Sequence, residues 1–227
     1  MEKTLNLLFL GTCDYEKALE IQFQILKKRQ DGEIADTLIL VEHPAVITLG
    51  KSASVENVVV SEKELARQRI QLYETNRGGD VTYHGKGQIV GYPIIHLIEN
   101  QMKVRSFVKK LEDVFVNILK DDHLEAEGST KDIGVWVGDA KITAIGLAVK
   151  KGVTMHGFAF NVNTNLDHFQ YIIPCGIKDK GVTTLEKLLG APRDFREMNQ
   201  RVVDEFVKVY GYQRLQKITL KELNLGK

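Results

Sequence analysis

The spacing of apolar residues predicts a chain of short strands combined with a few amphipathic helices. Apolar runs typical of strands cover residues 5–10, 37–41, 46–49, 70–73, 89–97 and 153–162. Helical spacing covers residues 15–29, 61–69, 106–119, 184–189 and 196–209. Because strands and helices do not alternate regularly, we expect an α+β fold, with a mixed, mainly antiparallel sheet and flanking helices.

Two predicted helices carry recognisable local signals. In residues 15–29 the apolar stripe has one polar exception, Gln22, and residues 27–29 place three basic side chains in the last turn, where the helix dipole favours them. The second helix opens at residues 61–64 with Ser-Glu-Lys-Glu, the pattern of a capping box. Residues 134–149 alternate around a Gly-Asp pair and predict a hairpin.

Composition favours one globular domain over residues 1–227. Hydrophobic residues make up 43% of the chain, and the net charge of +1 gives no electrostatic footprint for nucleic acid or an anionic membrane. The sequence has no apolar run of transmembrane length and no signal-peptide pattern at its N-terminus. Two cysteines cannot build a disulfide framework, so a reducing cytoplasm is expected.

A glycine-rich stretch at residues 76–93 is the first candidate for chemistry. Four glycines fall within ten residues, and polar side chains stand between and beside them: Gly78, Gly79, Gly85 and Gly87, with Arg77, Asp80, Thr82, Tyr83, His84 and Gln88. Glycine lets a backbone approach a ligand closely, and successive amides can form an anion-binding nest. A hairpin turn alone would explain the glycines, but it would not need the polar side chains.

Nucleotide and metal motifs are incomplete. Residues 50–52, Gly-Lys-Ser, resemble the end of a Walker A loop, but Ala45 stands where its first glycine belongs. The glycine pair at residues 85 and 87 lacks the third glycine of a dinucleotide fingerprint, since Val90 occupies that position. The six histidines and two cysteines show no zinc-ligand spacing, so neither a metal nor a cofactor is expected.

The two cysteines have different predicted roles. Cys13 stands near the start of the first helix and is expected to be a small buried hydrophobe. Cys175, between proline and glycine in a polar, irregular segment, is a candidate nucleophile that needs a neighbour to favour its thiolate. Lys141 follows the turn of the predicted hairpin and is one candidate, although the pattern alone favours an ordinary solvent-facing lysine.

Together these motifs resemble the lipoyl (octanoyl) transferase family, which moves octanoyl from acyl carrier protein to lipoyl domains. The matching segments follow the family's order from about residue 38 to 190, and they are residues 40–50, 77–84, 134–138, 141–146, 153–163, 173–177 and 181–183. One departure is Lys86, where the family usually has proline. This lysine is expected to loosen the loop and to add a charge at the mouth of the site.

The resemblance implies a fold like the catalytic domain of biotin and lipoate protein ligases. It also implies a catalytic pair, Cys175 and Lys141, with His156 as a possible assisting residue and no metal. The implied substrate contacts are Arg77, Gly78, Gly79, Asp80, Val81, Thr82, Tyr83, His84, Ala144, Ile145, Gly146, Gly157, Phe158 and Ala159.

The activity implied is transfer of octanoyl, or lipoyl, through a cysteine thioester without ATP. The implied partners are octanoyl-acyl carrier protein, as donor, and the lipoyl domains of 2-oxoacid dehydrogenases and the glycine cleavage H protein, as acceptors. The enzyme is expected to be a cytoplasmic monomer that binds neither nucleic acid nor membrane. Three alternatives stay open: an ATP-dependent lipoate or biotin ligase, a lipoyl amidotransferase, and a non-catalytic acyl-binding relative.

Overall fold

The computed structural model describes residues 2–173 and 181–225, and most of their strands join one large sheet. Its order is β12 (Arg214–Ile218), β1 (Thr4–Thr12), β2 (Asp36–Glu42), β6 (Gln88–Ile94), β10 (Val153–Asn161), β9 (Ala140–Lys150), β8 (Gly134–Val137) and β7 (Glu127–Gly128), and β11 (Gly181–Val182) also pairs with β9. Pairing is parallel at β12–β1, β1–β2 and β11–β9, and antiparallel elsewhere. The predicted mixed, mainly antiparallel sheet is therefore confirmed.

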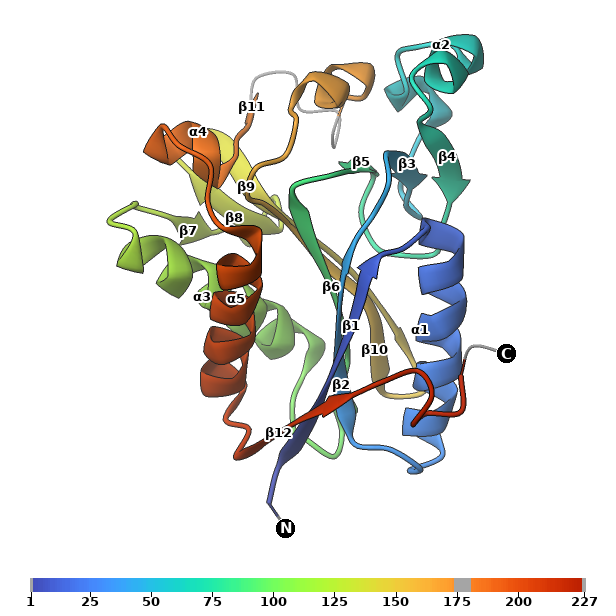
Figure 1. Cartoon of the computed structure of the whole chain (residues 1–227), viewed down its shortest axis with the longest axis vertical. Coiled ribbons are helices and arrows are strands. Elements are labelled where there is room, and N and C mark those ends of the chain that lie inside the picture. Colours follow the sequence, from blue (N-terminus) through green and yellow to red (C-terminus); the bar gives the residue numbers. More distant parts are fainter. Residues whose placement is uncertain (1, 174–180, 226–227) are drawn as a thin grey trace.

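A second, smaller sheet lies near one end of the large one (Figure 1). Its order is β4 (Gln71–Glu74), β3 (Val46–Leu49) and β5 (Val81–His84). Helix α2 (Glu62–Arg67) and the short 3-10 helices η1 (Val55–Asn57) and η2 (Asp167–Tyr171) accompany it. Ile47, Leu65 and Tyr83 belong to its separate hydrophobic cluster.

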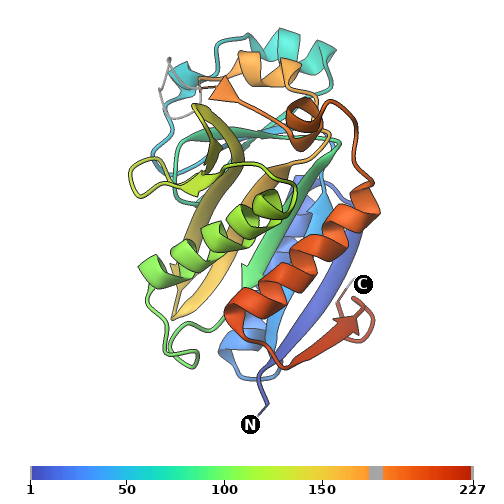
Figure 2. The same cartoon turned by 90° about the vertical axis from the view of Figure 1, so that its left-hand side faces the viewer.

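Helices cover both faces of the large sheet, as Figures 1 and 2 show. Helix α1 (Tyr15–Gln30) packs on one face, while α3 (Val104–Asp121) and α5 (Phe195–Tyr210) pack on the other; α4 (Leu185–Leu189) is a short helix before α5. The core is divided into two clusters, one on each face of the sheet. Strand β2 contributes to both, because successive side chains of a strand point to opposite faces. Leu38 and Leu40 join the cluster under α3 and α5, and Ile39 joins the cluster under α1.

Local signals predicted some element ends better than others. The Ser61 hydroxyl accepts the Glu64 amide at 3.2 Å, so the predicted N-cap is confirmed. The helix ends at Arg67, earlier than predicted, and Arg69 has a positive φ of 56°. The prediction missed β12 because most of its side chains are exposed and carry little apolar periodicity.

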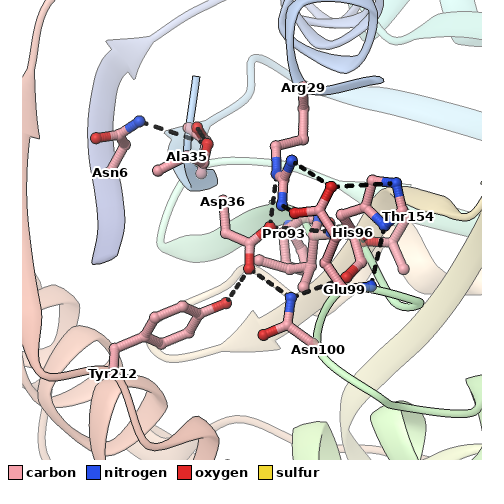
Figure 3. Close-up of polar contacts among 12 residues, drawn as sticks. Asn6, Arg29, Ala35, Asp36, Pro93, His96, Glu99, Asn100, Thr154 and Tyr212 are labelled. Atoms are coloured by element: carbon pink, nitrogen blue, oxygen red, sulfur yellow. Dashed lines mark hydrogen bonds and ion pairs between the residues drawn. The ribbon is translucent and has the colours of Figure 1, made fainter. Parts of the chain in front are cut away.

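A buried carboxylate ties several elements together at the start of β2 (Figure 3). Asp36 accepts hydrogen bonds from Arg29 Nε at 2.8 Å, the His96 amide at 2.9 Å, Asn100 Nδ2 at 2.8 Å and the Tyr212 hydroxyl at 3.0 Å. These donors come from α1, the segment after β6 and the segment after α5. Both oxygens of the carboxylate are therefore satisfied, as a buried charge requires.

No helix within residues 2–173 and 181–225 is long and apolar enough to cross a membrane.

We predict that Asp36→Ala destabilises the fold by about 3 kcal/mol or more, because the Tyr212 hydroxyl and the His96 amide lose their acceptor and the buried Arg29 guanidinium keeps only the half-exposed carboxylate of Glu99. Urea unfolding at neutral pH measures this loss. Asp31→Ala is the matched control. Asp31 pairs with Lys27 at an exposed position, so its loss is expected to stay below about 1 kcal/mol. Equal losses in the two variants would contradict the central role of Asp36.

Candidate functional site

A cavity of about 590 Å³ brings together most of the predicted site residues. Its lining comes from the loop before β5, from β5, β6, β9 and β10, and from the first turns of α3. The predicted residues that line it are Arg77, Gly78, Gly79, Asp80, Val81, Thr82, His84, Lys141, Ala144, Ile145, Gly146, His156, Gly157, Phe158 and Ala159. Cys175 lies outside the described residues.

Two residues singled out in the sequence lie elsewhere. Tyr83 is not among the described residues that line the cavity; its hydroxyl lies 2.9 Å from Nδ1 of His168, and its ring packs edge-on against Phe169. A Cβ at Gly85 would lie 2.1 Å from the Tyr83 hydroxyl, so this glycine makes room for the ring. Lys86 is exposed at the hairpin turn and is also absent from the described lining, so the charge expected at the mouth of the site is misplaced.

The loop at residues 77–80 is fixed by its neighbours in the small sheet. Arg77 is 8% exposed, and its guanidinium donates to the Thr48 carbonyl at 2.6 Å and to the Thr48 hydroxyl. The amides of residues 50–52 donate to the carbonyls of Asp80, Arg77 and Gly79, respectively. The amides of the Walker-like Gly-Lys-Ser segment are thus used within the fold.

Glycines allow this loop to lie close to strand β9 on one side and to residue 50 on the other. The Gly78 amide donates to the Leu147 carbonyl at 2.9 Å. A Cβ at Gly146 would lie 2.7 Å from the Gly78 oxygen, and a Cβ at Gly50 would lie 2.2 Å from the Gly79 oxygen. A side chain at Gly50 or Gly146 would therefore displace the loop from its place in the cavity wall.

His156 reaches the cavity from an irregular point in β10. It has φ of 56°, a conformation that side chains rarely adopt, and it is 1% exposed. Its amide donates to Gln22 Oε1 at 3.0 Å, which explains the polar exception on the apolar face of α1. Its Nε2 contacts Asn76 Oδ1 at 2.7 Å, beside the glycine-rich loop. A Cβ at Gly157 would collide with the Gly91 carbonyl at 2.0 Å.

His84 belongs to a chain of side-chain amides. Gln88 Nε2 donates to the Tyr83 carbonyl and to Asn161 Oδ1, so Gln88 Oε1 faces His84 Nδ1 at 2.8 Å as an acceptor. Asn161 Nδ2 in turn donates to the Thr183 carbonyl at 3.1 Å. This arrangement assigns the proton of neutral His84 to Nδ1.

An aromatic group forms one wall of the cavity. Tyr15 and Tyr92 line it, and the ring of Tyr15 stacks on that of His84 with centroids 6.1 Å apart. Behind them His43 lies between the Cys13 carbonyl at Nδ1 and the Tyr92 hydroxyl at Nε2, both at 2.7 Å. Cys13 is only half-buried, which corrects the prediction of a buried hydrophobe. Burial, in the first place, raises the pKa of its thiol.

Lys141 occupies a special position in β9. Its Nζ donates to the Ile133 carbonyl at 3.2 Å and lies 4.9 Å from the centre of the Trp136 ring. A register shift in the β8–β9 pairing, between Val135 and Trp136, breaks the regular alternation on which the surface interpretation depended. Val182 pairs with Lys141 on the other side and lines the same cavity.

Sequence reasoning missed part of the cavity wall. The missed residues are Tyr15, Ser52, Val90, Tyr92, Val104, Val108, Lys131, Asp132, Ile133, Leu147, Asn161, Phe169 and Val182. Most are apolar or aromatic residues that match the local pattern of a helix or strand, so no short-range signal sets them apart. Across the described residues, no three histidine, cysteine or acidic side chains are grouped so that they would hold a metal ion.

The chain is similar in sequence to a known family over most of its length. Residues 14–207 match the family model described as the lipoyl protein ligase A/B catalytic domain. An octanoyltransferase of Alkaliphilus metalliredigens is 55% identical over 92% of this chain and 96% of its own length. One of Caldicellulosiruptor saccharolyticus is 52% identical over 91% and 89%.

Solved structures share the fold at low sequence identity. A putative lipoate protein ligase from T. acidophilum with bound lipoic acid has a TM-score of 0.79 and 20% identity, covering 98% of this chain and 91% of its own. A biotin protein ligase from Aquifex aeolicus in complex with biotin and ATP has a TM-score of 0.55 and 14% identity, covering 91% and 70%. The expected likeness to ligase catalytic domains is therefore confirmed for the fold.

We predict a loss of stability in mild acid, caused by three buried histidines. Burial lowers the pKa of His43 to about 4, and those of His84 and His156 to about 3. A histidine in the unfolded chain has a pKa near ~6.5, so as the pH falls the unfolded state binds protons before the folded state does. The stability that these neutral histidines contribute is therefore fully present above about pH 6.5. It is lost as the pH falls toward their pKa values in the folded protein.

At about pH 5.5 each of these histidines should cost about 1.4 kcal/mol of unfolding free energy relative to pH 7.5. Urea unfolding at both pH values measures the sum, and NMR of the imidazole ring protons identifies the groups that do not titrate. Equal stability at the two pH values would show that these rings are not held neutral by the fold.

Proposed function

This chain belongs to the lipoyl protein ligase A/B family, and we propose from that membership that it is an acyltransferase that moves octanoyl groups in protein lipoylation. The observation that carries the proposal is the 42–55% identity to octanoyltransferases over most of the chain. The placement of the predicted contact residues around one cavity supports it.

The proposed reaction uses Cys175 as nucleophile. Its thiolate attacks the carbonyl of an octanoyl thioester on acyl carrier protein, and the carrier's thiol leaves with a proton. The amine of a lysine on a lipoyl domain then attacks the acyl-enzyme, forming an amide and releasing the Cys175 thiolate. Lys141 favours the thiolate by its charge and exchanges the protons, since an ammonium and a thiolate stabilise each other.

Two observations on the described residues support the proposal. Lys141 lines the cavity, and Val182, which pairs with it in β11, lines it too. The chain before Cys175 is anchored at Ile173, whose amide donates to the Asn57 carbonyl at 2.8 Å. Backbone amides of the glycine-rich loop are candidate donors to the oxyanion of the tetrahedral intermediate.

The apolar part of the cavity suits a medium-length acyl chain. Val90, Phe158 and Ala159 line it together with the rings of Tyr15 and Tyr92. Each methylene buried there would contribute about 0.8 kcal/mol to binding. Octanoyl carries its activation in the thioester bond, so this reaction needs no nucleotide.

The wider biological setting is also proposed. Residues 1–227 form a single catalytic domain that acts as a monomer in the cytoplasm. The acceptors are lipoyl domains of 2-oxoacid dehydrogenases and of the glycine cleavage H protein. The acceptor lysine of these domains would have to reach the cavity from solvent, and Val104 and Ile133 are lining residues that remain exposed.

We predict that mixing the protein with octanoyl-acyl carrier protein gives a covalent octanoyl thioester on Cys175. Intact mass should rise by one octanoyl group, and hydroxylamine should remove it. Cys13→Ala is the matched control and should keep the adduct, whereas Cys175→Ser should lose the hydroxylamine-labile thioester.

The same experiment separates the rival functions. Product formed from free octanoate only when ATP and magnesium are added would favour a ligase. Transfer from a lipoylated protein, without transfer from acyl carrier protein, would favour an amidotransferase. An unchanged mass during active transfer would exclude the covalent mechanism.

We predict that Lys141→Met raises the pKa of the Cys175 thiol toward about 8.5, because the neighbouring charge is lost. Acylation at neutral pH should fall by more than the loss of thiolate alone, since proton exchange is lost too. Lys141→Arg should restore the charge but not the proton exchange, because arginine does not deprotonate. The pH dependence of Cys175 alkylation by iodoacetamide measures the thiol pKa.

Lys120→Met provides a matched control for that test, since Lys120 is an exposed lysine that is not among the described residues lining the cavity. It should leave both alkylation and turnover nearly unchanged. If Lys141→Met behaves like this control, Lys141 has no part in the chemistry.

A further inference from the structure

The peptide unit that joins Ile133 to Gly134 is held from both sides. Its carbonyl oxygen accepts a hydrogen bond from Lys141 Nζ at 3.2 Å. Its N–H, which belongs to Gly134, donates to Glu112 Oε1 at 3.3 Å. One peptide plane therefore connects a carboxylate on α3 with the ammonium group that lines the cavity.

The orientation of this peptide depends on glycine. Gly134 has φ of 141°, in the region that side chains rarely adopt. A Cβ there would lie 2.5 Å from the Thr143 oxygen and 3.3 Å from both Cδ and Cε of Lys141. The missing side chain thus leaves the space along which the Lys141 stem runs to the Ile133 oxygen.

Glu112 is an unusual residue for the core-facing side of α3. It is 3% exposed, and among the other side chains buried on that helix Phe107, Leu111 and Phe115 are typical. Burial, in the first place, raises its pKa, whereas the Gly134 amide lowers it. Its carboxylate also lies against Gly128, where a Cβ would be 2.6 Å from Oε2. A buried carboxylate is costly unless it is hydrogen-bonded, and the Gly134 amide supplies such a bond here.

We propose that Glu112 is a positioning residue for Lys141, acting through the Ile133–Gly134 peptide. The proposal rests on the proposed function only where it concerns catalysis, because the coupling between the two side chains is a property of the fold. Neither Glu112 nor Gly134 is among the described residues that line the cavity, so the influence of Glu112 passes through the peptide to Lys141.

The physical basis is cooperativity between hydrogen bonds in series. A carboxylate that accepts the N–H polarises the peptide and makes its oxygen a better acceptor. The Ile133 oxygen then stabilises the charged form of Lys141 and fixes the direction of its Nζ. Removing the charge of Glu112 should weaken this acceptor and lower the pKa of Lys141.

The test uses Glu112→Gln, which keeps the volume and an acceptor oxygen but removes the charge. Competitive labelling of lysines with acetic anhydride across a range of pH, read by mass spectrometry, gives the pKa of Lys141 in the whole protein. We expect a decrease of about 0.5 unit, equivalent to about 0.7 kcal/mol. Octanoyl transfer should fall about threefold or more in kcat, with KM for the acyl donor little changed.

Glu205→Gln is the matched control. Glu205 lies on α5, is partly buried and accepts from Asn117 of α3, but its side chain lies outside the described cavity lining. It should change neither the labelling of Lys141 nor kcat. Glu112→Asp, which keeps the charge on a shorter stem, should restore part of the Lys141 pKa.

A reciprocal measurement keeps Glu112 intact and covers the case in which Glu112→Gln fails to fold. In Lys141→Met the amide proton of Gly134 should shift upfield in the NMR spectrum, because its peptide loses the cation. A Gly134 amide that does not move, or a Lys141 pKa equal in wild type and Glu112→Gln, would overturn the proposal. A shifted Lys141 pKa beside a fully active Lys141→Met would support the coupling while refuting the proposed role of Lys141 in transfer.

Discussion

The cavity depends on one steric constraint, the close contact between the backbone of residues 77–80 and its two neighbours. On one side the amides of residues 50–52 and the buried Arg77 guanidinium fix the loop to the small sheet. On the other side the Gly78 amide binds β9 at Leu147, and Gly146 leaves no Cβ to separate the two backbones. The loop therefore lies between the two sheets. Its close approach to the neighbouring backbones depends on positions where glycine has no side chain.

Local sequence signals predicted the elements well where one residue dictates the geometry. The Ser61 cap, the apolar stripes of α3 and α5 and the hairpin before Lys141 follow from propensity and periodicity. The family resemblance added the catalytic pair, which composition and spacing alone left open. In the second sheet, β3 and β4 were predicted as strands, whereas β5 was not, because it lies within the polar, glycine-rich stretch. The exposed β12 was missed because its side chains carry little apolar periodicity.

The site itself shows why long-range geometry escapes a local interpretation. Tyr83 stands within the glycine-rich motif, yet strand alternation turns its ring toward His168, away from the described cavity lining. Tyr15 and Tyr92 read as ordinary helix and strand residues, yet both line the cavity. Gln22 interrupted an apolar stripe for a reason that only the fold reveals, the unusual backbone of His156. Polar exceptions in a regular pattern were the most informative signals.

The structure also separates stability from chemistry along the length of β2. At its first residue, Asp36 accepts four hydrogen bonds from three separate segments of the chain. At its last residue, Glu42 Oε1 accepts the Gly87 amide at 2.8 Å, next to His43, whose ring lies edge-on to that of the cavity-lining His84. The unusual backbone of His156 lies farther along the sheet, where β10 forms the cavity wall, and buried polar atoms of Gln22 and His156 lack a hydrogen-bond partner among the described residues. Strained backbone and incompletely satisfied polar groups persist only where surrounding structure holds them. Asp36 and its donors hold together the sheet and helix α1, which carry this backbone. The proposed Glu112–peptide–Lys141 chain follows the same principle, because in it a charge buried in the core orients a charge at the cavity wall.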